Sequence, residues 1–360
     1  MSIGVALLGA GVFAKREHLP AIKSCSSLSL KAVYSRSQSS AESFIAASGE
    51  DTQAYFDSPS VLSKSLDDLL QRDDIGAVII AVAITAAPVL IKKALAAGKH
   101  VLSEKPIAPD VEMALELMDY HQHLCHQQTK PILWGVGENF RFWNPVHRAA
   151  NILKELEGSL VTFSVTAYSF TDARNPFYSS EWRQKPTFQG GYLLDGGVHF
   201  VAVLRTLLAA LGEKVKSVSA HTTSLQAHLP PVDTVHAILR TANGRSGTYI
   251  SSVGIEAKRA MEFEIVTDKG SVTYRPFQKE IVVNKKQDQE GDSWEAASES
   301  VTLMWGVKEE IAAFAEGIAM GRLDSRLSSD EALEDLRVME AMLSSGDAQG
   351  MPVDIGKETE

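Results

Sequence analysis

An acid and an imidazole stand close together in an otherwise apolar segment, residues 190–200, which reads GGYLLDGGVHF. A charged carboxylate is seldom buried without a partner, so Asp195 and His199 either lie in a surface turn or face a functional site. Four positions apart, they share one face if the segment is helical. An acid beside a histidine can orient the imidazole, which then serves as a general base. A helix start with Asp195 as its N-cap and His199 as an incidental core residue is the alternative.

A lysine with possible chemistry lies in the segment Glu104-Lys105-Pro106, directly after a predicted strand at His100–Ser103. The carboxyl end of a strand in an open α/β sheet is where ligands sit. Pro106 restricts Lys105 to an extended backbone, which can hold the amine toward a cleft. A lysine in that position can polarise a hydroxyl or carbonyl oxygen, or exchange a proton. Taken alone, the segment also suits a surface lysine in a turn.

A dinucleotide fingerprint opens the chain. The first predicted strand leads into Gly9-Ala10-Gly11-Val12-Phe13-Ala14, a GxGxxA pattern. The first glycine permits a tight turn, the second lets the backbone approach a pyrophosphate, and the small third residue allows close helix–strand packing. The N–H groups of the following helix then face the phosphates. A glycine-rich turn without a ligand is the alternative.

The end of the second predicted strand bears on the choice of cofactor. A fold specific for NAD usually carries an acid there, whereas this chain has Ser35 and Arg36. Arginine suits a 2′-phosphate, so we predict that NADP(H) is favoured over NAD(H). A solvated arginine in a turn is the alternative.

The first half of the chain alternates between strands and helices. We expect strands at Ser2–Leu8, Leu28–Tyr34, Ala54–Phe56, Ala77–Ala83, His100–Ser103 and Ile132–Gly137, and helices at Phe13–Ser24, Ser65–Gln71, Ala86–Ala97 and Pro109–His126. Ser65 is a candidate N-cap, Gly98 suits a helix C-terminus, and Pro20 should bend or delimit the first helix. The alternation predicts a doubly wound parallel sheet, the Rossmann fold.

The second half is rich in strands joined by short turns. We expect strands at Leu160–Phe170, Val215–His221, Thr234–Thr241, Ser246–Val253, Met261–Thr267, Ser271–Tyr274 and Glu280–Asn284, then helices at Gly306–Met320 and Ser328–Ser344, the latter capped by Ser329 or Asp330. Asn243-Gly244 and Lys269-Gly270 suit hairpin turns. This predicts a second, α+β domain with a large, open, mainly antiparallel sheet.

The domain boundary is expected near Gly137–Pro145. Residues 1–137 would form the dinucleotide-binding domain, and residues 138–360 the substrate-binding and oligomerisation domain. The C-terminal helix 328–344 is a candidate to pack back on the first domain.

Composition excludes several classes of protein. The chain is 44% hydrophobic and 22% charged, as is ordinary for soluble globular proteins, and its net charge of -10 argues against nucleic-acid binding. The apolar run Ile3–Ala10 is too short to span a membrane and lacks the features of a signal peptide. Cys25 and Cys125 form no CxxC pair. We therefore expect a cytoplasmic protein whose partner is a small molecule, with neither nucleic acid nor membrane.

Four segments together resemble the Gfo/Idh/MocA oxidoreductase family. They are the GxGxxA turn, Ser35-Arg36, AGKHVLSEKP at 97–106 and GGYLLDGGVHF at 190–200. The resemblance covers essentially the whole chain and is closest to an uncharacterised plant and fungal branch, through PILWGVGENFRF and SSEWRQ. It implies an enzyme that transfers hydride between a nicotinamide and a secondary alcohol or ketone of a sugar, polyol or related molecule. With Arg36, we expect that cofactor to be NADP(H). It also implies a dimer, or a dimer of dimers, formed through the C-terminal sheet.

The resemblance further assigns roles to single residues. Lys105, Asp195 and His199 would meet in the cleft between the domains, where the glycines at 190, 191, 196 and 197 let the backbone approach the nicotinamide. His199 would take or give the hydroxyl proton, Lys105 would hold the developing alkoxide, and Asp195 would orient one of them; which of Lys105 and His199 is the base stays open. The implied cofactor-binding residues are Gly9, Gly11, Val12, Phe13, Ala14, Ser35, Arg36, Ala83, Glu104, Lys105 and Asn139.

The candidate substrate contacts come from two segments. Arg141 belongs to GENFRF, whose alternative role is an ordinary strand-to-helix loop. Tyr178, Trp182 and Arg183 lie in the long loop 171–189, and long loops in compact proteins often bind ligands. A packed lid without direct substrate contact is the alternative for this loop. We predict no metal site, because the histidines and cysteine of residues 121–126 lack a carboxylate and end an ordinary amphipathic helix.

The chain also departs from the family pattern. Ala202 stands where many members have Asp, Ile84-Thr85-Ala86 lacks the common Thr-Pro, and Val89 replaces a usual His. The substrates of well-known members are therefore not transferred to this chain. Two other functions are open: a non-catalytic NADP(H)-sensing regulatory protein, which would have no need for all of Lys105, Asp195 and His199, and a biliverdin-reductase-like reductase.

Overall fold

The structure is a computed structural model that describes residues 2–48, 52–58, 60–127, 131–286, 294–302 and 305–356. These residues form two compact units. One comprises Met1–Asn139 with Val307–Leu333, and the other Phe140–Gly306 with Glu334–Glu360. The first segment thus ends two residues beyond the expected boundary. Val307–Leu333, which we expected in the second domain, belongs to the first unit, and the C-terminal helix belongs to the second unit from Glu334 onward.

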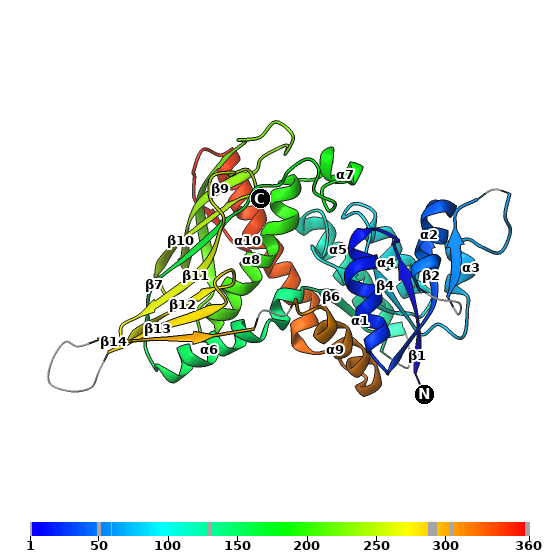
Figure 1. Ribbon diagram of the computed structural model, residues 1–360, viewed down its shortest axis with the longest axis horizontal. Coiled ribbons are helices and arrows are strands. Elements are labelled where there is room, and N and C mark those ends of the chain that lie inside the picture. Colours follow the sequence, from blue (N-terminus) through cyan, green and yellow to red (C-terminus); the bar gives the residue numbers. More distant parts are fainter. Residues whose placement is uncertain are drawn as a thin grey trace. The chain divides into compact units, whose positions relative to one another are not determined.

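The first unit is built on a sheet of six parallel strands in the order β3-β2-β1-β4-β5-β6 (Figure 1). Their bounds are β1 Ile3–Leu8, β2 Leu28–Ser35, β3 Gln53–Phe56, β4 Ala77–Ile80, β5 His100–Glu104 and β6 Trp134–Gly137. The residues of β4 are all buried, as expected for a strand covered on both faces. The strand order reverses between β1 and β4, the switch point at which such sheets bind ligands. The predicted Rossmann sheet is confirmed.

The first unit also contains helices, most of which connect these strands. They are the π-helix η1 Ala14–His18, α1 Leu19–Ser24, α2 Gln38–Ser48, α3 Leu66–Leu70, α4 Ala87–Ala96, α5 Val111–Gln127, α9 Val307–Met320 and the 3-10 turn η3 Ser325–Leu327. Helix α9 packs on η1 and α1, so it belongs to this unit although it follows the second sheet in sequence.

Most helix ends that the sequence predicted agree with the structure, and two need correction. Ser65 caps α3, and its hydroxyl accepts the backbone N–H of Asp68. The expected single helix Phe13–Ser24 is instead a π-helix followed by α1, because Pro20 has no N–H to continue the ladder. The final helix α10, Ser329–Asp347, is capped one residue earlier than expected, since the Ser328 hydroxyl accepts the N–H of Asp330.

The second unit contains a nine-stranded sheet in the order β14-β13-β12-β11-β7-β10-β9-β8-β15. The bounds are β7 Leu160–Tyr168, β8 Val215–Thr223, β9 Thr234–Thr241, β10 Ser246–Ser252, β11 Ala260–Thr267, β12 Gly270–Arg275, β13 Glu280–Lys286, β14 Trp294–Ser300 and β15 Val353–Asp354. Neighbours run antiparallel except β7 and β10, which are parallel. The predicted mainly antiparallel sheet is therefore confirmed, with hairpins at Asn243-Gly244 and Lys269-Gly270.

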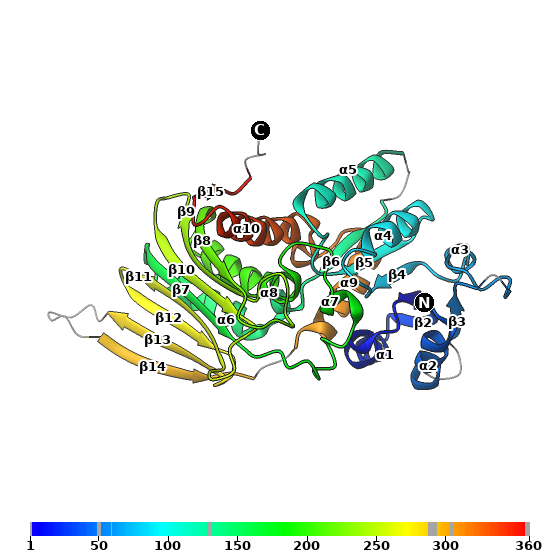
Figure 2. The same cartoon turned by 90° about the horizontal axis from the view of Figure 1, so that it is seen from above.

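Helices cover one face of this sheet (Figure 2). They are α6 Asn144–Glu155, α8 Gly191–Ala209 and α10, while the short α7 Glu181–Gln184 and the 3-10 turn η2 Asn139–Phe142 lie in connecting segments. Side chains alternate along the strands, so Tyr249, Phe263 and Ile265 are buried beneath the helices. On the opposite face Ile238 is 58% exposed.

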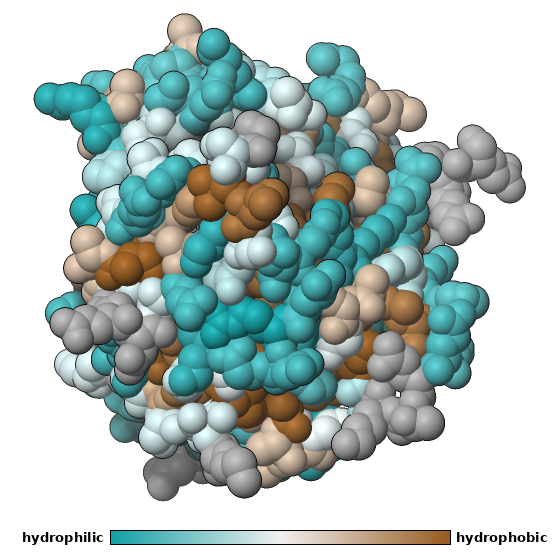
Figure 3. All heavy atoms as spheres, turned by 90° about the vertical axis from the view of Figure 1, so that its right-hand side faces the viewer, coloured by the Kyte–Doolittle hydropathy of each residue, from teal (hydrophilic) through white to brown (hydrophobic). Residues whose placement is uncertain are grey.

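Helix α8 is long and apolar enough to cross a membrane by composition alone, but 61% of that stretch is buried inside the protein. It is the central core helix of the second unit, where it packs on β7, β10 and β11. Figure 3 shows one face of the molecule, on which hydrophilic side chains predominate and apolar ones form separate patches.

Candidate active site

The fingerprint turn has the backbone that its glycines predict. Gly9 has φ +118°, and a Cβ atom there would lie 2.1 Å from the Ala81 carbonyl oxygen, so only glycine fits. Ala14 is buried at the start of η1. A Cβ atom on Gly11 would meet nothing within 4 Å. The first and third positions therefore serve the fold, and the second leaves open space of the kind a bound pyrophosphate requires.

The remaining proposed cofactor positions in this unit follow the carboxyl ends of other strands of the same sheet. Ser35 ends β2, Ala83 follows β4, Glu104 ends β5 and Asn139 follows β6. The carbonyl of Ala83 accepts the N–H groups of Ala86 and Ala87 as α4 begins. Parallel strands bring their carboxyl ends to the same end of the sheet, so these residues lie at the end where Gly9 follows β1.

An acid that the sequence reading missed lies beside Arg36. Asp57 directly follows β3, and β3 pairs with β2 so that Ser35 and Phe56 are opposite each other. The Tyr34 hydroxyl donates to Oδ2 of Asp57 at 2.8 Å. Burial and this hydrogen bond raise the pKa of Tyr34. Arg36 itself is exposed and forms no ion pair within the part of the chain that the structure describes.

The segment that carries Lys105 is connected to the fingerprint helix. Nε2 of His18 donates to Oε1 of Glu104 at 2.7 Å, and His18 is only 1% exposed. The Lys105 N–H donates to the Gly137 carbonyl at 3.3 Å, and the Lys105–Pro106 peptide bond is cis. His18 was not a predicted site residue, because nothing in the spacing pairs it with Glu104.

On α8, Asp195 has a cationic partner that the sequence did not reveal. Nε of Arg183 donates to Oδ2 of Asp195 at 2.8 Å, and Asp195 is only 5% exposed. The guanidinium lies 4.0 Å from the centroid of the Trp182 ring and also donates to the Phe177 carbonyl at 3.1 Å. The loop 171–189 thus places the Arg183 guanidinium beside the predicted acid. Arg183 and the adjacent Trp182 are both proposed substrate contacts.

His199 lies one turn further along α8, half-buried, with its ring stacked on Phe140. The ring centroids are 4.2 Å apart and the planes differ by 13°. Phe140 is in turn stacked on Trp143, with centroids 3.6 Å apart. Neither aromatic residue was among the predicted site residues.

The glycines of this segment do not share one role. Gly190 and Gly191 have φ of +68° and +51°, and a Cβ atom on Gly191 would lie 2.3 Å from the Pro230 carbonyl oxygen. A Cβ atom on Gly197 would meet the end of Met339 at 2.6 Å. Only Gly196 has nothing within 4 Å of its Cβ position. Of the four glycines implied to approach a nicotinamide, three are explained by packing inside the protein and one faces open space.

Two predicted substrate contacts use their polar groups inside the protein. Arg141 is 4% exposed and forms an ion pair with Asp335, which also accepts from Arg205 at 2.6 Å. The Tyr178 hydroxyl donates to the His228 carbonyl, and its ring is buried. The geometry therefore supports anchoring roles for Arg141 and Tyr178.

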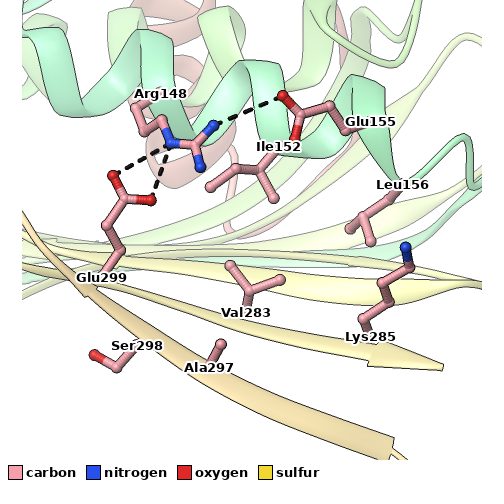
Figure 4. Close-up of a pocket in the computed structure, with 9 residues that line it drawn as sticks. All are labelled: Arg148, Ile152, Glu155, Leu156, Val283, Lys285, Ala297, Ser298 and Glu299. Carbon is pink, nitrogen blue, oxygen red and sulfur yellow. Dashed lines mark hydrogen bonds and ion pairs between the residues drawn. The ribbon is translucent and has the colours of Figure 1, made fainter. Parts of the chain in front are cut away.

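None of the residues predicted to act lines the hollow shown in Figure 4. It has a volume of about 260 Å³ between α6 and the strands β13 and β14. Its two acids already pair with Arg148, which binds Glu299 at 3.0 Å and Glu155 at 3.6 Å. We assign no function to it.

His121 of α5 contacts neighbouring groups of its own unit. Nε2 of His121 lies 2.7 Å from the Ile132 carbonyl and 3.4 Å from Sγ of Cys125. Among the described residues, no group of three or more His, Cys, Asp or Glu side chains is placed to hold a metal ion.

The fold and the site residues define a nicotinamide-dependent class of oxidoreductase, and sequence comparison gives the family. Residues 3–127 match the profile "Oxidoreductase family, NAD-binding Rossmann fold", and residues 155–355 match "Oxidoreductase family, C-terminal alpha/beta domain". The chain belongs to the Gfo/Idh/MocA oxidoreductase family. It is 42% identical to "Dehydrogenase FPY6" of Fusarium mangiferae over 350 residues, which cover 97% of each chain.

Solved structures show the same fold. An oxidoreductase from Thermotoga maritima superimposes with a TM-score of 0.84 at 28% identity, covering 99% of both chains. A levoglucosan dehydrogenase in complex with NADH and levoglucosan gives 0.80 at 20% identity over 99% of this chain and 100% of that one. A 3-ketoreductase from Actinomadura kijaniata with TDP-benzene and NADP gives 0.72 at 22% identity, over 96% of this chain and 98% of that one. At these lower identities the likeness concerns the fold alone.

Proposed function

We propose that this oxidoreductase uses NADP(H) to interconvert a secondary alcohol and its ketone on a sugar, a polyol or a related small molecule. The observation that carries the proposal is the position of Lys105. It follows β5 at the same sheet edge as the open Gly11 turn and Arg36. A cationic donor at the carboxyl edge of a dinucleotide-binding sheet is suited to stabilise a developing alkoxide.

The preference for NADP(H) is supported by Arg36. Its guanidinium is exposed, forms no ion pair in the described ranges, and follows β2 where a 2′-phosphate would lie. Asp57 argues against a preference for NADP(H), because its carboxylate would repel a 2′-phosphate. One oxygen of Asp57, however, accepts a hydrogen bond from the Tyr34 hydroxyl. The solved relatives carry NADP in one case and NADH in another, so the preference rests on this chain's own residues.

In the proposed reaction the bound nicotinamide supplies or accepts the hydride. His199 exchanges the hydroxyl proton, and Lys105 donates to the substrate oxygen as negative charge develops. Asp195, paired with Arg183, holds the N-terminal part of α8 and the substrate loop together. Trp182 and Arg183 are the substrate contacts that we retain, because each keeps part of its side chain exposed. A hydroxylated substrate suits this combination of polar groups.

We also propose that a second copy of the chain covers the outer face of the nine-stranded sheet. His236, Ile238, Thr248 and Ile250 lie on this face in adjacent strands, and Ile238 is largely exposed. Covering exposed apolar side chains such as Ile238 favours association. Light scattering should give two or four times the chain mass of 39.1 kDa, and a monomer would exclude this interface.

The test of the cofactor site is a fluorescence titration of the purified protein with NADPH and, in parallel, NADH. We expect tighter binding of NADPH. Arg36→Ala should weaken NADPH binding by roughly 10- to 100-fold, the range for a lost hydrogen bond to a charged group, and leave NADH unchanged. Arg240→Ala, an exposed arginine on β9, is the matched control. Equal affinities would overturn the preference, and binding of neither would overturn the proposed function.

The test of the chemistry is turnover of a panel of keto sugars and polyols with the preferred cofactor. Lys105→Met should lower kcat by about 100-fold or more while cofactor affinity stays near wild type. Normal turnover in this variant would exclude the role of Lys105. Cofactor binding without turnover of any panel member would favour the sensing protein over the enzyme.

A further inference from the structure

The segment GENFRF contains an aromatic residue whose position suggests a function of its own. Phe140 lies in η2 with its ring face against the imidazole of His199. We propose that Phe140 is a positioning residue that sets the ring plane of His199. The inference rests on the proposed function, since it concerns the group that exchanges the substrate's proton.

The stacking geometry restricts rotation of the His199 imidazole ring. A centroid separation of 4.2 Å with planes only 13° apart means that one face of the imidazole is covered by the Phe140 ring. Rotation of His199 about its Cβ–Cγ bond would drive the ring edge into that face. The two ring nitrogens lie in the imidazole plane, so a fixed plane fixes the directions in which they can hydrogen-bond. Aromatic contacts of this kind also contribute attraction beyond simple burial.

Phe140 cannot move away from His199, because its other side is filled. Trp143 stacks on it with ring centroids 3.6 Å apart and is itself fully buried, in edge-to-face contact with Tyr274 and Trp305. The three rings of Trp143, Phe140 and His199 therefore form one column. A well-packed column resists displacement, since interiors have few voids into which a ring could shift.

The turn that carries Phe140 is held by charge as well as by packing. Arg141 forms a buried ion pair with Asp335 of α10, and Asp335 also accepts from Arg205, which lies on α8 beyond His199. The residue next to Phe140 is therefore joined, through one carboxylate, to the helix that carries His199. Breaking a buried ion pair by removing one partner is costly, so this connection keeps η2 in place along α8.

The sharpest test uses the signal of His199 itself, which needs no known substrate. The full-length protein is labelled at histidine Cε1, and the His199 resonance is assigned by its loss in His199→Asn. In the wild type the Hε1 proton should show an aromatic ring-current shift from Phe140. Phe140→Met keeps a similar volume without an aromatic face, so it should remove the shift and broaden the signal. Phe140→Tyr should restore both.

Matched controls separate positioning from general loss of structure. Phe163→Leu removes another buried ring of the same unit, on β7, and should leave the His199 resonance unchanged. NADPH affinity and thermal unfolding are measured for every variant. A His199 resonance that is the same in wild type and Phe140→Met would overturn the proposal. So would a failure of a folded Phe140→Tyr to restore the signal.

The outcome is independent of the proposed function. If NADPH does not bind, or Lys105→Met turns over normally, the enzyme assignment fails while the His199 spectrum still reports on the stack. If an enzyme substrate is found, Phe140→Met should lower kcat by roughly 10- to 100-fold with little change in KM, because a misplaced catalytic group loses rate rather than binding. An unchanged kcat with a lost ring-current shift would show that the stack does not position His199 for catalysis.

Discussion

Nε2 of His18 lies 2.7 Å from Oε1 of Glu104, and this hydrogen bond joins two parts of the cofactor edge that are 86 residues apart. His18 is the last residue of η1, the π-helix that follows the fingerprint turn. Glu104 is the residue before Lys105. The turn proposed to hold the pyrophosphate and the lysine proposed to hold the alkoxide are therefore connected through one partly buried hydrogen bond.

Removing this contact should lower stability. His18→Ala leaves a partly buried carboxylate without its donor, which costs about 1–3 kcal/mol in the free energy of unfolding. Urea unfolding measures the difference, and His126→Ala, at an exposed histidine on α5, is the control. Glu104→Gln should cost less than His18→Ala, since the amide oxygen can still accept from Nε2. Equal stability of wild type and His18→Ala would show that the contact contributes nothing.

The Arg183–Asp195 pair should behave as a coupled unit. Arg183→Ala removes a charged hydrogen-bond donor from the buried Asp195 carboxylate, so we expect a loss of about 1–3 kcal/mol in the free energy of unfolding. Asp195→Asn removes the charge, and the double variant should be more stable than the sum of the single effects predicts. The measurement is a double-mutant cycle from chemical unfolding. Additive effects would mean that the two side chains do not interact in solution.

Two glycines of the same helix should respond in opposite directions to alanine. Gly191→Ala forces a Cβ atom to within 2.3 Å of a backbone carbonyl at positive φ, so it should destabilise the protein by about 1–3 kcal/mol. Gly196→Ala meets open space inside a helix and should stabilise it by about 0.5–1 kcal/mol. Thermal unfolding of the two variants distinguishes them. Similar losses at both positions would contradict the open space at Gly196.

Stability should decline with acid partly through His100. Burial lowers the pKa of His100 from its ordinary value of 6.5, and its Nδ1 accepts the Leu133 N–H at 3.0 Å. Between the lower folded pKa and 6.5 the unfolded chain binds more protons, so the free energy of unfolding falls as pH falls through this window and levels off below it.

The matching variant is His100→Gln, whose side-chain oxygen can accept the same N–H but does not titrate. Its melting temperature should change less than that of the wild type between about pH 7.5 and about pH 5.5. His126→Gln, at an exposed histidine on α5, should retain the wild-type slope. An identical slope in His100→Gln would show that His100 is not the group responsible.

Much of the candidate site was predictable, because its residues are adjacent in sequence to recognisable elements. The GxGxxA turn, Arg36 after β2 and Lys105 after β5 all follow short apolar strands whose carboxyl ends must meet at one edge. Helical spacing predicted a shared face for Asp195 and His199, and the family resemblance implied their roles. What sequence reasoning missed were contacts between segments distant in sequence. Asp57 contacts Tyr34 only because β3 pairs with β2. The sequence held one indication of this acid, its position directly after a predicted strand.

The sequence by itself determined the two kinds of sheet, because hydrophobic periodicity, glycine turns and caps act within a few residues along the chain. It did not determine the partners of buried charges. Arg141 was expected to contact substrate, but tertiary packing places it against Asp335, nearly two hundred residues away. A buried guanidinium must find a carboxylate wherever the fold supplies one, and only the assembled helices decide which it is. The same holds for Phe140 and His199, whose stacking depends on how η2 and α8 pack.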